Sequence, residues 1–154
     1  MKQCPTFELR PATPDEFPFA AEIYINAMRP LMLKLGAWDE PMRRAGIRRS
    51  YKAADSCIIV LDGIDIGWTQ ISVRDADYNI AQIQILEEYC GLGIGSQIIR
   101  DLQLRAQNEG KTISLSAVRT NRAIELYKRL GFRIIDSEAT PIIDMVWEPD
   151  SDVC

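Results

Sequence analysis

Short stretches of alternating apolar and polar residues run along this chain, and longer stretches with helical spacing of apolar residues separate them. Alternation predicts half-buried strands, and recurrence at helical spacing predicts amphipathic helices. The strands are expected at 7–10, 57–61, 64–73, 78–86, 112–118, 132–136 and 142–147, and the helices at 13–30, 40–52, 94–110 and 121–130. The order β-α-α-β-β-β-α-β-α-β-β then predicts an α/β fold, with a mixed, mostly antiparallel sheet and helices on both faces.

Turn and cap residues mark the ends of several elements. Gly63, in the pair Asp-Gly, predicts a two-residue hairpin because glycine adopts a positive φ without steric cost. Thr13 and Glu16 predict a capping box at the start of the first helix. Pro30 is expected to end or kink this same helix. The strand, glycine-rich turn, helix and strand over 78–118 form a βαβ unit, so one pair of strands is expected to be parallel.

The composition fits a folded protein of ordinary size. The chain has 154 residues, of which 47% are hydrophobic, and one domain is expected over 1–154 with a frayed tail at 149–154. The N-terminal sequence lacks the apolar stretch of a signal peptide, and no run approaches the ~18 apolar residues of a membrane span. We therefore expect a cytoplasmic protein with no membrane association. The formal net charge of −4 argues against a nucleic-acid partner, because such proteins carry a basic surface.

The sequence contains no histidine, and this restricts the chemistry more than any other feature. Ser–His–Asp catalysis, Cys–His catalysis and His-ligated zinc are all excluded. Acid–base chemistry must then use Asp, Glu, Tyr, Lys, Cys or water. The four cysteines, Cys4, Cys57, Cys90 and Cys154, form no CxxC pair, so no metal site is expected and a reducing compartment is favoured.

A glycine-rich segment, 90–96, lies between a predicted strand and the start of a predicted helix. Backbone N–H groups at a helix start are free, and glycines let a ligand approach them. This arrangement predicts a cradle for a phosphate or pyrophosphate. Ser96 stands where both the GxGxxG and the GxxxxGK[ST] patterns need glycine, so neither of those nucleotide sites is predicted. A strand-to-helix turn without a ligand is the alternative.

A second motif, NRAIELYKRLGF, lies beyond the next strand at 121–132. It fits the pattern Asn-x-Ala-x-x-Leu-Tyr-x-x-x-Gly-Phe at every fixed position. Together with the glycine-rich segment, read as (Gln/Arg)-x-x-Gly-x-(Gly/Ala), it makes residues 78–136 resemble the GNAT superfamily of acetyl-CoA-dependent N-acyltransferases. Cys90 departs from that pattern, because it stands where the family has a Gln or Arg that helps hold the loop or the pyrophosphate. The change is expected to weaken CoA binding by ~1–2 kcal/mol.

The resemblance implies an enzyme that moves an acetyl group from acetyl-CoA to a primary amine of a small molecule or peptide, directly within a ternary complex. Tyr127 is then the donor that protonates the leaving thiolate, because a phenol with a pKa near ~10 is protonated at pH 7. The N–H of Leu86 is expected to stabilise the developing oxyanion. The residues expected to bind the cofactor are Ile85, Leu86, Glu87, Gly91, Leu92, Gly93, Ile94, Gly95, Ser96 and Asn121. Core packing of Tyr127 and helix capping by Asn121 are the alternatives.

The acceptor side carries weaker signals. Tyr24, Met28 and Trp38 are expected to wall an acceptor pocket, with core packing as the alternative use of each. Arg44 and Arg48 share a helix face that attracts an acidic acceptor or the CoA 3′-phosphate, or that is simply solvated.

No general base is assigned from the sequence. The strand before the glycine-rich segment offers Gln82 and Gln84 but no carboxylate, and a chain of water molecules serves equally well. This gap, together with Cys90, motivates the alternative of a non-catalytic acyl-CoA-binding regulatory module. The resemblance is also compatible with a homodimer.

Overall fold

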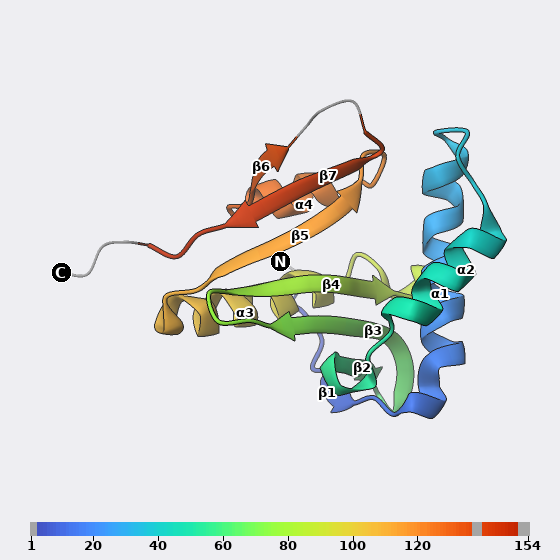
Figure 1. The fold of residues 1–154 in the computed structure, drawn as a ribbon. Helices are drawn as coiled ribbons and strands as arrows, with labels where there is room; N and C mark the ends of the chain where they lie inside the picture. The colour runs from blue at the N-terminus through green and yellow to red at the C-terminus, as the bar shows by residue number, and fades with distance from the viewer. Residues whose placement is uncertain (1–2, 137–139, 151–154) are drawn as a thin grey trace.

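The computed structural model describes residues 3–136 and 140–150. Within them a seven-stranded sheet has the order β1-β2-β3-β4-β5-β7-β6 (Figure 1). The strands are β1 (Glu8–Pro11), β2 (Ser56–Leu61), β3 (Ile64–Val73), β4 (Asp77–Ile85), β5 (Thr112–Val118), β6 (Arg133–Asp136) and β7 (Ile142–Trp147). The helices are α1 (Phe17–Leu33), α2 (Glu40–Ser50), α3 (Ile94–Glu109) and α4 (Ala123–Arg129), and short 3₁₀ turns are η1 (Pro14–Glu16), η2 (Ala53–Asp55) and η3 (Glu87–Tyr89). The predicted α/β class, the order of elements and the mixed, mostly antiparallel sheet are confirmed.

The centre of the sheet is split between its two middle strands. β4 and β5 are parallel, but they pair only from Asp77 opposite Thr112 to Ile80 opposite Leu115. Beyond Ile80 the strands diverge toward the carboxyl end of β4 (Figure 1). A bulge begins the divergence, because Ala81 has no counterpart on β3 where the register shifts. A bulge bends the strand that carries it, and here it leaves half of one edge of β4 unpaired.

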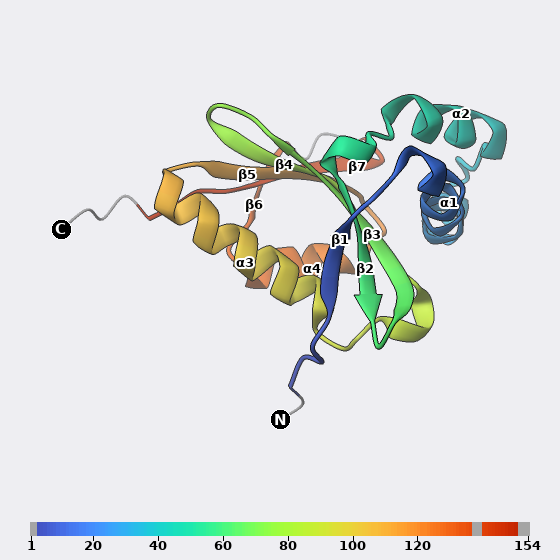
Figure 2. The ribbon, with the colours of Figure 1, turned by 90° about the horizontal axis from the view of Figure 1, so that it is seen from below.

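Helices cover both faces of the sheet, as the sequence predicts. Figure 2 shows α3 and α4 on one side and α2 on the other. Apolar residues of α3 and α4 pack against β4, β5 and β7, and the buried members include Ile99, Leu102, Tyr127, Leu115 and Met145. Residues of α1 and α2 pack against β2 and β3 in a separate cluster that includes Ala21, Ile25, Ile47, Ile58 and Trp68. β4 and β5 therefore diverge between two faces of the sheet that are both covered by helices.

Local signals predicted several elements to the residue. The strands at 64–73, 112–118 and 142–147 have the expected bounds. Between β2 and β3, Asp62 and Gly63 both adopt positive φ, 52° and 77°, so the expected two-residue hairpin is present.

The ends of α1 differ from the sequence prediction. The Thr13 N–H donates to the Glu16 carboxylate at 3.0 Å, but this cap begins the 3₁₀ turn η1 and not the α-helix itself. Pro30 does not end α1, which continues to Leu33. A proline removes only one N–H donor from the hydrogen bonds of the helix. The side chain of Met32, in the last turn of α1, is buried, and this packing stabilises the turn.

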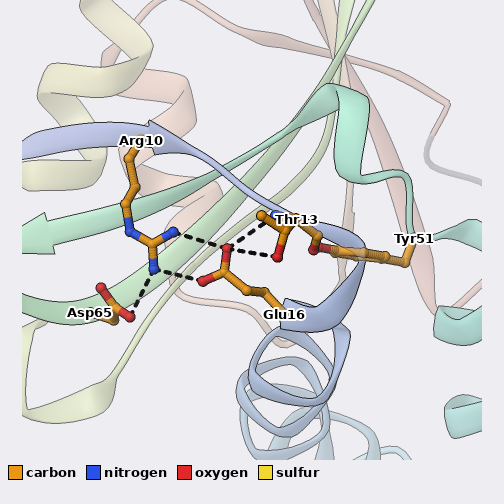
Figure 3. Close-up of polar contacts among 5 residues, drawn as sticks. All are labelled: Arg10, Thr13, Glu16, Tyr51 and Asp65. Atoms are coloured by element: carbon orange, nitrogen blue, oxygen red, sulfur yellow. Dashed lines mark hydrogen bonds and ion pairs between the residues drawn. The ribbon is translucent and has the colours of Figure 1, made fainter.

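A charged cluster ties the N-terminal strand to the rest of the fold (Figure 3). Arg10 of β1 donates from both terminal nitrogens to Glu16, at 2.9 and 2.6 Å, and also to Asp65 of β3 at 3.0 Å. The hydroxyl of Tyr51 donates to the Thr13 carbonyl at 2.8 Å. The hydrogen bond from Arg10 lowers the pKa of Glu16 below its ordinary value, and the same contact raises the pKa of Arg10.

Candidate active site

A cavity of about 210 Å³ occupies the place where β4 and β5 diverge. Residues of the two strands form its walls, α4 contributes from one face of the sheet, and α1 and α2 contribute from the other. The lining includes the side chains of Tyr24, Met28, Arg43, Gln82, Gln84, Ser116, Asn121 and Tyr127. The hydroxyl of Thr120 donates to the Leu31 carbonyl at 2.9 Å, which joins the β5–α4 loop to α1.

Tyr127 reaches the cavity from α4. Its side chain is 7% exposed, and its ring packs at 6.1 Å from the ring of Phe132. Its hydroxyl makes no hydrogen bond to any described residue, so the phenol is available to a ligand. Burial raises the pKa of Tyr127 above its ordinary value because the phenolate loses hydration. The group is therefore a protonated donor at neutral pH.

Asn121 performs a capping role and also lines the cavity. Its side-chain oxygen accepts from the Ala123 N–H at 2.8 Å, which satisfies a free donor at the start of α4. The amide nitrogen makes no hydrogen bond among the described residues. The oxygen therefore caps the helix, in agreement with the capping alternative, while the nitrogen is left free to donate and the expected contact with the cofactor stays a prediction.

The glycine-rich loop connects η3 to α3 and has the backbone conformation that its glycines predict. Gly91 and Gly93 have φ of 82° and 87°, in the left-handed region that favours glycine. A Cβ built on Gly91 meets nothing within 4 Å, so the space beside the loop is open. The first N–H groups of α3 have no intrahelical partner. This geometry is compatible with an anion site, and binding of the cofactor by Gly91, Leu92, Gly93, Ile94, Gly95 and Ser96 stays a prediction.

The unpaired edge of β4 corrects the expected role of Leu86. The Leu86 N–H donates to the Ile66 carbonyl at 2.8 Å, so it is not free to stabilise an oxyanion. The carbonyl groups of Leu86 and Glu87 accept hydrogen bonds within η3. In an antiparallel pair the backbone groups of successive residues point to alternate edges. Ile83 and Ile85 therefore present their N–H and carbonyl groups toward the diverging edge, and they are the strand residues that can align a ligand there.

Cys90 is a structural thiol in this geometry. Its sulfur contacts the carbonyl oxygens of Ile85 and Leu86 at 3.5 and 3.6 Å, as a weak donor. Desolvation, with the nearby Glu87 carboxylate, raises the pKa of the Cys90 thiol. A raised pKa reduces the thiolate fraction, so the residue is not an activated nucleophile. It holds the loop through its contacts with the end of β4.

The expected acceptor residues are placed differently from one another. Tyr24 and Met28 of α1 line the cavity, as expected. Trp38 does not belong to the lining, and its ring instead lies 5.6 Å from the Arg29 guanidinium. Arg43 of α2 does line the cavity, although the sequence analysis assigned it no site. A signal was present, because Arg43 precedes the buried Ile47 by one helical turn and so shares its inward face.

The other arginines of α2 are already engaged. Arg44 forms ion pairs with Glu22 and Glu40, at 2.8 and 2.9 Å. The guanidinium of Arg48 lies 4.9 Å from the centre of the Phe17 ring. Of the alternatives for this helix face, a solvated surface with local ion pairs fits better than an anion site.

No carboxylate contributes to the described lining of the cavity. Gln84 donates to Gln82 at 3.0 Å within it. The hydroxyl of Ser116 donates to the Asp144 carboxylate at 2.6 Å, which places one carboxylate behind a lining residue. Among the described residues, no group of three or more His, Cys, Asp or Glu is arranged to hold a metal ion, and no described helix is long and apolar enough to cross a membrane.

Comparisons with solved structures show the same fold. The PaiA N-acetyltransferase of Thermoplasma acidophilum, solved in complex with coenzyme A, superposes with a TM-score of 0.72 at 16% identity, over 93% of this chain and 99% of that one. An acetyltransferase from Thermus thermophilus gives 0.71 at 15% identity, over 94% and 98% of the two chains. A histone acetyltransferase HPA2 and related acetyltransferase from Corynebacterium glutamicum gives 0.64 at 23% identity, over 99% and 100%.

Sequence comparison assigns the family. A search among curated proteins gives no match. The family model described as acetyltransferase (GNAT) domain matches residues 53–134, which is more than half of the chain and includes the cavity strands, the glycine-rich loop and Tyr127. The chain belongs to the GNAT acetyltransferase family and is an acetyl-CoA-dependent acyltransferase.

Proposed function

We propose that this protein transfers the acetyl group of acetyl-CoA to a primary amine of a small molecule or peptide, directly within a ternary complex. One observation carries the proposal: the cavity between β4 and β5 is lined by residues of helices on both faces of the sheet. Tyr127 and Asn121 line it from the α4 side, while Tyr24 and Met28 line it from the α1 side. A thioester and an amine that enter from opposite faces meet there without a covalent enzyme intermediate.

The residues at the loop fit the anionic end of coenzyme A. The positive φ values of Gly91 and Gly93 and the open space at Gly91 form a cradle that a Cβ would strain or fill. Free N–H groups at the start of α3 suit a pyrophosphate, because the helix dipole also favours negative charge there. When bound, acetyl-CoA supplies an acetyl group activated as a thioester.

The side chains of this protein then have separate tasks. Backbone groups of Ile83 and Ile85 orient the extended arm along the open edge of β4, and an N–H of this edge faces the carbonyl oxygen on which negative charge develops. The amide nitrogen of Asn121 donates to the arm from the opposite wall. The Tyr127 hydroxyl gives its proton to the departing sulfur. The substrate amine loses its proton to water, or through Ser116 to Asp144.

The proposal is tested with purified protein in two steps. Calorimetric titration with acetyl-CoA should give micromolar binding, and a panel of primary amines should then release free thiol from acetyl-CoA. Binding without turnover on any amine would favour the acyl-CoA-binding module instead. Absence of binding at millimolar acetyl-CoA would show that Cys90 marks a lost site, and the proposal would fail.

Location and assembly stay predictions. Cys4, Cys57 and Cys90 are free thiols in the structure, and Cys154 lies outside the described residues. The expected homodimer is tested by the molar mass in solution.

A further inference from the structure

Arg43 is an arginine whose charge has no partner within the described structure. Its terminal nitrogens contact only the Tyr24 hydroxyl, at 3.4 Å, and the Met32 sulfur, at 3.5 Å. Its Nε is buried and makes no hydrogen bond. A guanidinium carries five N–H donors, and neither contact offers it a negative charge.

Other arginines of the same layer show the ordinary arrangement. Arg29 pairs with Glu40 at 2.9 Å, and Arg44 pairs with both Glu22 and Glu40. Arg48 and Arg49 of the same helix also form no ion pair among the described residues, but both are exposed to water, whereas Arg43 is partly buried. A partly buried cation without an anion is costly, because burial removes hydration that nothing replaces. A ligand that supplies an anion would remove this cost.

The position of Arg43 identifies which ligand that is. The guanidinium lines the cavity beside Tyr24 and Met28, on the face of the sheet opposite to α4 and its Tyr127. Among the described lining residues, Arg43 is the one charged side chain. The acetyl donor is expected from the α4 side, so the molecule that meets Arg43 is the acceptor.

We infer that the acceptor amine carries a carboxylate, which Arg43 binds while the Tyr24 hydroxyl orients the guanidinium. The inference rests on the proposed function and adds the substrate class. A guanidinium matches a carboxylate with two parallel hydrogen bonds. The cavity volume of about 210 Å³ lies below the ~300–1,000 Å³ of most ligand sites. A small acceptor such as a free amino acid fits this volume and charge, whereas an amine with only positive charge is repelled.

The experiment compares matched acceptors in matched variants. Free amino acids are each paired with their carboxamide and with the aminophosphonate of the same skeleton, and kcat/KM is measured for wild type, Arg43→Met and Arg44→Met. Wild type should prefer the carboxylate over the carboxamide roughly 10- to 100-fold, the range expected for hydrogen bonds to a charged group. Arg43→Met should abolish that preference through KM. Arg44→Met should keep it, because Arg44 pairs outside the cavity.

Each alternative outcome bears on a specific claim. Equal rates with acid and carboxamide, or a preference that survives in Arg43→Met, would overturn the inference while leaving acetyl transfer intact. A preference for the aminophosphonate would show that Arg43 binds a phosphate-like group, and it would overturn the inference that the acceptor carries a carboxylate. If acetyl-CoA does not bind, the proposed function fails. Calorimetry with N-acetylated amino acids then tests the anion site at Arg43 on its own. Binding that Arg43→Met abolishes would support this site, and binding that is absent or unchanged in the variant would overturn it. Far-UV circular dichroism confirms that each variant is folded.

Discussion

Tyr127 is a buried side chain that both packs in the core and faces the cavity. Its ring belongs to the core formed by α3, α4 and the sheet, while its hydroxyl stays unpaired at the cavity. Core packing and proton donation, which compete as interpretations of the sequence, are compatible in the structure. Core packing depends on the ring and proton donation depends on the hydroxyl. Removal of the hydroxyl oxygen alone therefore separates the two.

Tyr127→Phe should lower kcat by about 10²- to 10⁴-fold, the usual contribution of a positioned acid. Acetyl-CoA affinity should stay unchanged, since the ring remains packed on Phe132. The acid works only when protonated, and burial raises its pKa above the ordinary ~10. The alkaline loss of wild-type activity that depends on this group should therefore lie at higher pH than the titration of an ordinary phenol, and it should be missing from the variant.

Tyr78→Phe is the matched control for that experiment. The Tyr78 hydroxyl donates to Glu109 at 2.6 Å and does not line the cavity, so turnover should be unaffected. Full activity of Tyr127→Phe would contradict the assignment of the acid, and equal losses in both variants would point to a general effect on folding.

At the scale of elements, the close contact of β3 and β4 positions the open edge beside the cavity. A Cβ on Gly67 of β3 would lie 2.5 Å from the backbone oxygen of Gln84, a separation that real Cβ atoms do not show. Gly67 is opposite Ile85, the residue whose backbone we expect to align the cofactor. The glycine therefore sets the spacing of two strands at a functional place.

Gly67→Ala should destabilise the protein by about 1–3 kcal/mol, the usual cost of overpacking. It should also weaken acetyl-CoA binding, because β4 must move away from β3. Gly46→Ala on α2 is the control: nothing lies within 4 Å of that Cβ, so the helix should gain roughly 0.5–1 kcal/mol. Denaturant unfolding measures the stability and calorimetry measures the acetyl-CoA affinity. If both are unchanged in Gly67→Ala, the spacing of β3 and β4 adjusts without cost and the expectation is wrong.

A buried glutamine fastens the end of α2 to the sheet. Gln70 donates to the Ser50 carbonyl at 2.8 Å and accepts from the Lys52 N–H at 3.1 Å. Gln70→Leu should lower the free energy of unfolding by about 1–3 kcal/mol in total, because two part-buried backbone groups lose their hydrogen-bond partner. Gln97→Leu, at the exposed contact with Asp101, should cost much less in the same denaturation experiment. Similar losses of stability in the two variants would contradict a stabilising role for the hydrogen bonds of Gln70.

The sequence predicted what depends on neighbours in the chain. The β2–β3 hairpin and the left-handed backbone of Gly91 and Gly93 follow from local turn chemistry, and the resemblance named Tyr127, which the structure places at the cavity. The free edge of β4 depends on where β5 stops pairing, so the sequence assigned Leu86 a role that its bond to Ile66 prevents. Arg43 escaped notice for the same reason, because its missing partner is visible only when α1, α2 and the sheet are assembled.

At the scale of the whole molecule, the cluster of Arg10, Glu16 and Asp65 connects the first strand, the start of α1 and the third strand (Figure 3). The pKa of Glu16 is held below its ordinary 4.5, chiefly by the hydrogen bond from Arg10. A carboxylate with a lowered pKa in the folded state stabilises the protein fully above its unfolded pKa. That stabilisation is lost as the pH falls through the lowered value.

Glu16→Gln should therefore remove part of the acid sensitivity of folding. At pH 7 the variant should be less stable by up to about 1 kcal/mol, the range of partly exposed ion pairs. As the pH falls through the lowered pKa of Glu16, the two proteins should converge, because the wild-type carboxyl is then increasingly protonated as well. Glu125→Gln is the control, since Glu125 is 71% exposed and lies 3.6 Å from Lys128, and its unfolding curve should follow wild type at every pH. A difference in the free energy of unfolding between Glu16→Gln and wild type that stays constant from pH 7 to pH 2 would contradict this expectation. It would mean that the amide disturbs the local packing, and that the charge of Glu16 does not contribute to stability.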